Sequence, residues 1–159
     1  MPAKFVTEYC IPMNEPNATT GSAEIEMYID GASRGNPGPS GIGVVICRNG
    51  KAIKNLSAYI GNATNNIAEY TALIHGLKEC LALKAGNIQI NTDSELLCRQ
   101  INKIYKIKSP NILALYDQAL QLLSGFKDAR VRHIPRENNR GADKLAAKAV
   151  NEALKKALL

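Results

Sequence analysis

The stretch YIDGASRGNPGPSGIGVVI, residues 28–46, decides how the chain begins to fold. The segment EIEMYID, which runs into it, alternates polar residues with Ile25, Met27 and Ile29, as a half-buried β-strand does. A glycine- and proline-rich segment then interrupts this pattern, and IGVVIC resumes it. Two neighbouring antiparallel strands joined by a turn are the simplest structure for this stretch.

Beyond these strands the pattern first continues and then changes period. The hairpin signal Asn49-Gly50 is followed by AIKNLSAYI (52–60), which is rich in strand-forming residues and predicts a three-stranded meander. From residue 65 to 84 the apolar residues recur at helical spacing, and Gly86 follows as a stop signal. This segment is predicted to be an amphipathic helix.

The remaining segments alternate between helices and strands. NIQINTD (87–93) and ARVRHIP (129–135) are predicted strands. SELLCRQINKI (94–104), PNILALYDQALQLLSG (110–125) and the segment from 138 to the C-terminus are predicted helices. Strands first and then alternating helices and strands indicate an α/β fold with a sheet of mixed direction.

The chain has the size of one domain. Its 159 residues are enough for one sizeable core but too few for two. Residues 1–23 carry Pro12, Pro16 and a TTGS run, which predict an irregular N-terminal tail, so the folded domain is expected over residues 24–159.

Composition excludes some classes of protein and favours others. A hydrophobic content of 45%, with no apolar run of the roughly 18 residues that span a bilayer, predicts a soluble protein without a membrane role. Because the first residues lack the pattern of a secretory signal, a cytoplasmic location is expected. Four scattered cysteines without metal-ligand spacing predict reduced thiols. The net charge of +6 weakly supports a polyanionic partner.

Four acidic residues stand at the ends of predicted elements, and each has an ordinary structural explanation. Asp30 can begin a turn, and Glu69 can form a capping box with Asn66. Asp93 and Asp143 can stabilise the first turns of their helices through the helix dipole. Taken one at a time, these explanations are sufficient.

Taken together, the four acids favour a metal site. Two of them lie at strand ends and two at helix starts, and such positions can converge on one edge of a sheet. Clustered carboxylates repel one another unless cations neutralise them, and oxygen-only ligands suit Mg²⁺ or Mn²⁺. Two such ions about 4 Å apart can activate water and stabilise the leaving oxygen of a phosphodiester.

Four segments in order resemble ribonuclease HI, the type 1 branch of the ribonuclease H family, from about residue 26 to 149. They are the opening stretch, TNNIAEYTALIHGL, NTDSELLCRQI and ENNRGADKLA. The resemblance implies a ribonuclease H-like fold, with a mixed five-stranded sheet of order 3-2-1-4-5 and helices on both faces. It also implies an endonuclease that hydrolyses the RNA strand of RNA–DNA hybrids by two-metal-ion catalysis, leaving 5′-phosphate and 3′-hydroxyl ends. No membrane and no obligate protein partner is expected.

The resemblance assigns roles to individual positions. The matches for the catalytic residues, which also bind two Mg²⁺ or Mn²⁺ ions, are Asp30, Glu69, Asp93 and Asp143. The matches for residues that contact the RNA sugars are Ser33, Asn36, Asn65 and Asn66, where short polar groups suit recognition of the 2′-hydroxyl. Thr64 matches a residue of the pocket that binds a DNA phosphate. These five residues have alternative explanations in turns and helix caps.

Two departures from the family pattern leave alternatives open. The loop before the last helix is short, and His133 can either assist catalysis as an auxiliary residue or simply end the last strand, which is the simpler interpretation. The long basic insertion between the middle helices is missing. Its replacement, NKIYKIKS (102–109), carries three lysines that either contact the hybrid or form a solvated loop.

Three other functions compete with the nuclease. A dinucleotide-binding loop would explain the dense glycines of residues 35–43, but GIGVVI leads into a strand, whereas that motif opens a helix. A non-catalytic nucleic-acid-binding module with the same fold is the more serious alternative. The third is an accessory domain within a larger assembly. The presence of all four acids favours the nuclease.

Overall fold

The structure is a computed structural model that describes residues 4–5 and 24–158. An antiparallel meander comes first, formed by β2 (Ile25–Ser33), β3 (Gly38–Arg48) and β4 (Lys51–Ala63). The following elements are α1 (Asn65–Ala82), β5 (Asn87–Thr92), α2 (Glu95–Ile101), α3 (Pro110–Leu123) and β6 (Asp128–His133). A short 3-10 helix, η1 (Arg136–Asn138), leads into α4 (Arg140–Ala157).

The sheet has the predicted mixed order. β5 pairs in parallel with β2 and β6, whereas β2, β3 and β4 are antiparallel. Counted from β2, the five main strands follow the order 3-2-1-4-5, so this prediction is confirmed. A sixth strand, β1 (Lys4–Phe5), pairs in parallel with β6 at the edge. Those two residues are the only described part of the predicted tail, and they form a strand; residues 1–3 and 6–23 lie outside the described residues.

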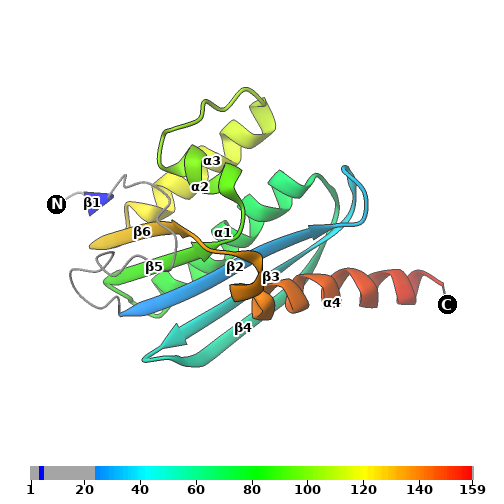
Figure 1. The fold of residues 1–159 in the computed structure, drawn as a ribbon, viewed down its shortest axis with the longest axis horizontal. Helices are drawn as coiled ribbons and strands as arrows, with labels where there is room; N and C mark the ends of the chain where they lie inside the picture. The colour runs from blue at the N-terminus through cyan, green and yellow to red at the C-terminus, as the bar shows by residue number, and fades with distance from the viewer. Residues whose placement is uncertain (1–3, 6–23, 159) are drawn as a thin grey trace.

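Helices cover both faces of the sheet (Figure 1), as predicted. α1 packs on one face with α3 beside it, and α4 crosses β2, β3 and β4 on the other. The alternating apolar residues of β2 face α1, so that Met27, Leu73 and Leu77 are fully buried. The core therefore lies between the sheet and α1.

No helix in the described part of the chain is long and apolar enough to cross a membrane. The prediction of reduced thiols is confirmed for Cys47 and Cys80, which are free. It is wrong for Cys98, which is disulfide-bonded.

Two glycines set the distances at which helices approach the sheet. A Cβ atom on Gly31 would lie 2.5 Å from the backbone carbon of Ala68 in α1, and one on Gly43 would lie 2.0 Å from the carbonyl oxygen of Ala142 in α4. Since real side chains do not tolerate such distances, glycine is required at both positions. Gly31 and Gly43 thus allow close helix packing, which brings α1 and α4 close to the end of β2.

Candidate active site

The four predicted acids come from four elements that meet at one edge of the sheet. Asp30 lies in β2, Asp93 directly follows β5, Glu69 is in α1 and Asp143 is in the first turn of α4. Carboxylate oxygens of Asp30, Glu69 and Asp93 lie within 4.8 Å of one another. Asp143 lines the same pocket and interacts with Asp30 through its carboxyl group. The structure thus brings together residues separated by up to 113 positions, from 30 to 143.

The helices beside Glu69 and Asp93 are capped by other residues. The hydroxyl of Thr64 caps α1 by accepting a hydrogen bond from the Ile67 amide at 3.2 Å. The hydroxyl of Ser94 caps α2 by accepting one from the Leu97 amide at 3.1 Å. Neither helix start therefore needs the acid beside it, and both carboxylates point into the pocket instead.

The carboxylates are buried against one another, which disfavours their ionised forms. Asp30 is 5% exposed and Glu69 is 8% exposed. Burial, followed by the charge of Asp93, raises the pKa of Asp30 to about 7. Burial, followed by the charges of Asp30 and Asp93, raises the pKa of Glu69. Burial also raises the pKa of Asp93. Without a cation this arrangement opposes folding at neutral pH.

These residues fit a divalent cation. The Oε2 atom of Glu69 is buried and has no hydrogen-bond partner among the described residues. An unsatisfied buried carboxylate oxygen is costly, and a metal ion at that position would satisfy it. Three carboxylates offer oxygen atoms alone, the ligand type of hard cations such as Mg²⁺ and Mn²⁺. Asp30, Glu69 and Asp93 would hold the ion.

The residues before α4 complete this edge of the pocket. The side-chain amide of Asn139 donates a hydrogen bond to the carbonyl oxygen of Ile29 at 2.8 Å, and its bond to Asp93 partly offsets the rise in the pKa of that carboxyl. The guanidinium of Arg136 lies 4.0 Å from Asp143 and also lines the pocket. Sequence reasoning missed both, because a short loop has no periodicity to identify them.

The carboxylates sit in an open pocket of about 690 Å³. All five polar residues predicted to contact substrate line it: Ser33, Asn36, Thr64, Asn65 and Asn66. These five residues form the rim of the pocket, and several of them make hydrogen bonds that connect its parts. Asn36 accepts a hydrogen bond from the Asn65 amide at 3.0 Å, and the Ser33 hydroxyl donates one to the carbonyl oxygen of Ala63 at 2.9 Å. The turn after β2 is thereby joined to the start of α1.

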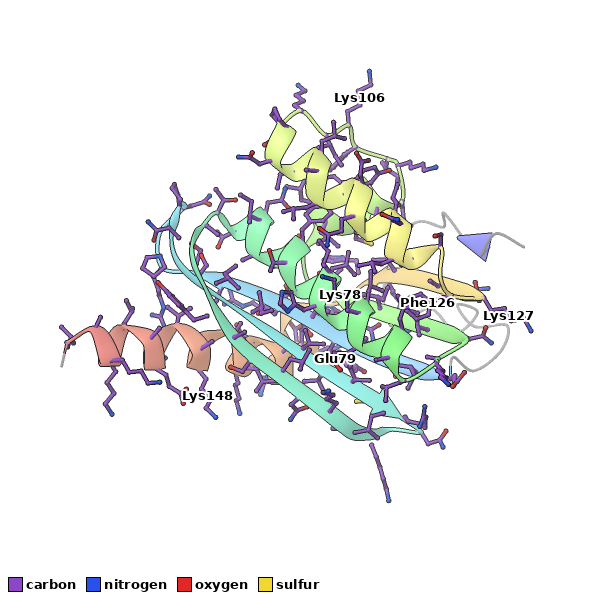
Figure 2. All side chains as sticks on the ribbon, turned by 180° about the vertical axis from the view of Figure 1, so that it is seen from behind. Lys78, Glu79, Lys106, Phe126, Lys127 and Lys148 are labelled. Atoms are coloured by element: carbon purple, nitrogen blue, oxygen red, sulfur yellow. The ribbon has the colours of Figure 1, made fainter. Side chains whose placement is uncertain are left out.

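Two other candidates lie outside this pocket. His133 is the last residue of β6, is half-buried and does not line the pocket, although its charge acts on Asp93. The three lysines of residues 102–109 are exposed on the loop between α2 and α3. Figure 2 shows Lys106 at the tip of this loop, pointing away from the sheet.

Comparison with known proteins identifies related sequences. A family model described as reverse transcriptase-like matches residues 28–149. The chain is 38% identical over 130 residues to ribonuclease HI of Halobacterium salinarum, a match that covers 81% of this chain and 65% of that protein. It is 40% identical over 136 residues to the bifunctional protein Rv2228c of Mycobacterium tuberculosis, covering 84% of this chain and 37% of that protein. The chain thus spans between about a third and two thirds of these relatives.

Solved structures agree closely with the fold. The crystal structure of RNase H1 from Halobacterium salinarum has a TM-score of 0.79 at 37% identity, covering 80% of this chain and 98% of that one. LC11-RNase H1, solved in complex with an RNA/DNA hybrid, has a TM-score of 0.78 at 40% identity, covering 82% and 99%. Their alignment includes nearly the whole length of both solved chains.

Proposed function

The chain belongs to the ribonuclease H family, type 1, and on this basis we propose that it is a metal-dependent endonuclease that cuts the RNA strand of RNA–DNA hybrids. The observation that carries the proposal is the set of three carboxylates with oxygens within 4.8 Å of one another in an open polar pocket. A hybrid is the partner found with the related LC11-RNase H1. A cytoplasmic location is part of the same proposal.

The positions of the pocket residues support the roles proposed for them. The residues that would hold two Mg²⁺ or Mn²⁺ ions are Asp30, Glu69 and Asp93, with Asp143 beside them. Such ions would supply the positive charge needed to activate an attacking water and to stabilise the leaving 3′-oxygen of the RNA, which corresponds to products with 5′-phosphate and 3′-hydroxyl ends. Because Asp30 and Glu69 are buried, the residues packed around them restrict the positions of their carboxylates.

The rim recognises the substrate. Ser33, Asn36, Asn65 and Asn66 contact the RNA sugars, since hydroxyl and amide groups can pair with the 2′-hydroxyl that distinguishes RNA from DNA. Thr64 contributes to the binding of a DNA phosphate. The hydrogen bond between Asn36 and the Asn65 amide connects the turn after β2 to the start of α1, and so fixes both segments relative to the carboxylates.

The test is cleavage of an end-labelled RNA–DNA hybrid by the purified full chain in Mg²⁺ or Mn²⁺, with EDTA as the metal-free control. We expect cuts in the RNA strand alone, with 5′-phosphate ends on the products, and no cutting of a DNA duplex of the same sequence. Binding of the hybrid without cutting in either metal, even with enzyme in excess, would show that the protein is a binding module instead.

Replacement of His133 by alanine is expected to lower kcat by less than tenfold. The imidazole stands at the end of β6 outside the pocket, so no essential proton transfer is assigned to it. The measurement is kcat on the same hybrid, with Arg132→Ala in the same strand as the control for disturbance of β6. A hundredfold loss confined to the histidine variant would give His133 a direct part in catalysis.

A further inference from the structure

Arg136 combines a hydrogen-bonded backbone with a side chain that is largely exposed to solvent. It begins η1, where the amide of Asn139 donates to the carbonyl oxygen of Arg136 at 3.0 Å. Asn139 is anchored in turn to β2 through Ile29, and Pro135 precedes the turn. The Arg136 side chain is nevertheless 81% exposed. The turn therefore presents an exposed guanidinium from a hydrogen-bonded backbone position at the edge of the pocket.

Its charge is opposite to that of its surroundings. Among the described residues that line the pocket, Arg136 is the one basic side chain, and it faces four carboxylates. One guanidinium nitrogen lies 4.0 Å from the Oδ1 atom of Asp143. An ion pair this exposed contributes little to stability, because water screens the two charges. The pairing with Asp143 thus orients the guanidinium, and separating the two groups costs little free energy.

The anionic substrate needs such a group. A phosphodiester that approaches a cluster of carboxylates is repelled, and its nonbridging oxygens remain negatively charged while it is cut. A guanidinium can donate two parallel hydrogen bonds to phosphate oxygens, a geometry that an ammonium group does not reproduce. Arg136 is placed to supply these bonds from the rim, on the side of the pocket formed by α4.

We propose that Arg136 is a phosphate-binding catalytic residue, whose guanidinium leaves Asp143 to bind a nonbridging oxygen of the phosphodiester that is cut. This inference rests on the proposed function and extends it to a residue outside the carboxylate cluster. Neither bond making nor proton transfer is assigned to Arg136; it supplies positive charge and orientation.

The test compares Arg136→Gln and Arg136→Lys with the wild-type chain, after the wild type has been shown to cut. Arg140→Gln is the matched control, because Arg140 is exposed, lies four residues further along and does not line the pocket. We expect Arg136→Gln to lower kcat about 10- to 100-fold, as for loss of one charged donor to the transition state. Lysine should restore part of this loss, and Arg140→Gln should change kcat less than threefold.

A second readout separates this role from support of the carboxylates. Calorimetric titration with Mn²⁺ should show that Arg136→Gln binds the metal at least as tightly as the wild type, since a nearby positive charge has been removed. A loss in kcat below tenfold, or one accompanied by an equal loss in metal affinity, overturns the inference. A wild-type chain that cuts no hybrid at all refutes the proposed function instead.

Discussion

Replacing Asp93 by asparagine is expected to lower kcat at least about 10³-fold, while the dissociation constant for the hybrid stays within about threefold of the wild type. The substitution keeps the size of the side chain but removes one of the three carboxylates that lie within 4.8 Å of one another. A bound metal contributes several kcal/mol to the transition state, and each 1.36 kcal/mol corresponds to a tenfold change in rate. Binding survives because the polar rim is untouched.

Cleavage and binding must be measured separately for this variant. Binding is measured by fluorescence anisotropy of a labelled hybrid in EDTA, and kcat in saturating Mg²⁺. Asp117→Asn is the matched control, since it removes the same charge from an exposed position on α3. If Asp93→Asn kept kcat within tenfold of the wild type, Asp93 would not be a metal ligand of the reaction.

Most of the fold could be predicted because its signals are local. Alternation in β2, the Asn49-Gly50 turn and helical spacing in α1 each depend on residues a few positions apart. β1 and η1 were missed, since two or three residues are too few to show a period. The strand order itself came from the resemblance to a family, because parallel pairing of β2 with β5 joins segments about 60 residues apart.

The site was less accessible to sequence reasoning. Position along the chain placed the acids at the ends of elements, but their convergence depends on how closely the helices approach the sheet. That distance is set by contacts such as Gly43 against Ala142, which no local pattern reveals. Spacing also suggested that Glu69 caps α1, whereas Thr64 does so. Arg136 carries no motif, and only its position over the folded pocket distinguishes it from the other arginines.

The cost of burying these acids predicts how the stability of the metal-free protein depends on pH. The pKa of Asp30 is raised from 3.8 to about 7 in the folded chain. Between these values the folded state holds a proton that the unfolded state releases, so the free energy of unfolding falls as pH rises. The stabilisation that comes from the proton on Asp30 is therefore fully present below about pH 4 and is lost by about pH 7. The raised pKa of Glu69 acts in the same direction.

Asp30→Asn should consequently be more stable than the wild type in EDTA at pH 8, by on the order of 2 kcal/mol. Asparagine cannot ionise, and its oxygen can still accept the hydrogen bond from the Gly31 amide that Asp30 accepts at 3.0 Å. The measurement is urea unfolding of both proteins at pH 5 and pH 8, with Asp117→Asn as the exposed control.

Adding Mg²⁺ should make the wild type more stable than Asp30→Asn, the reverse of their order in EDTA. Mg²⁺ bound only by the folded state stabilises the wild type, and it stabilises Asp30→Asn less because a ligand has been removed. The gain in stability without metal and the loss of metal response would then come from the same carboxylate. If Asp30→Asn were instead less stable than the wild type in EDTA at pH 8, repulsion within the cluster would not be the dominant cost. The case for a site built to be neutralised by cations would then lose its energetic basis.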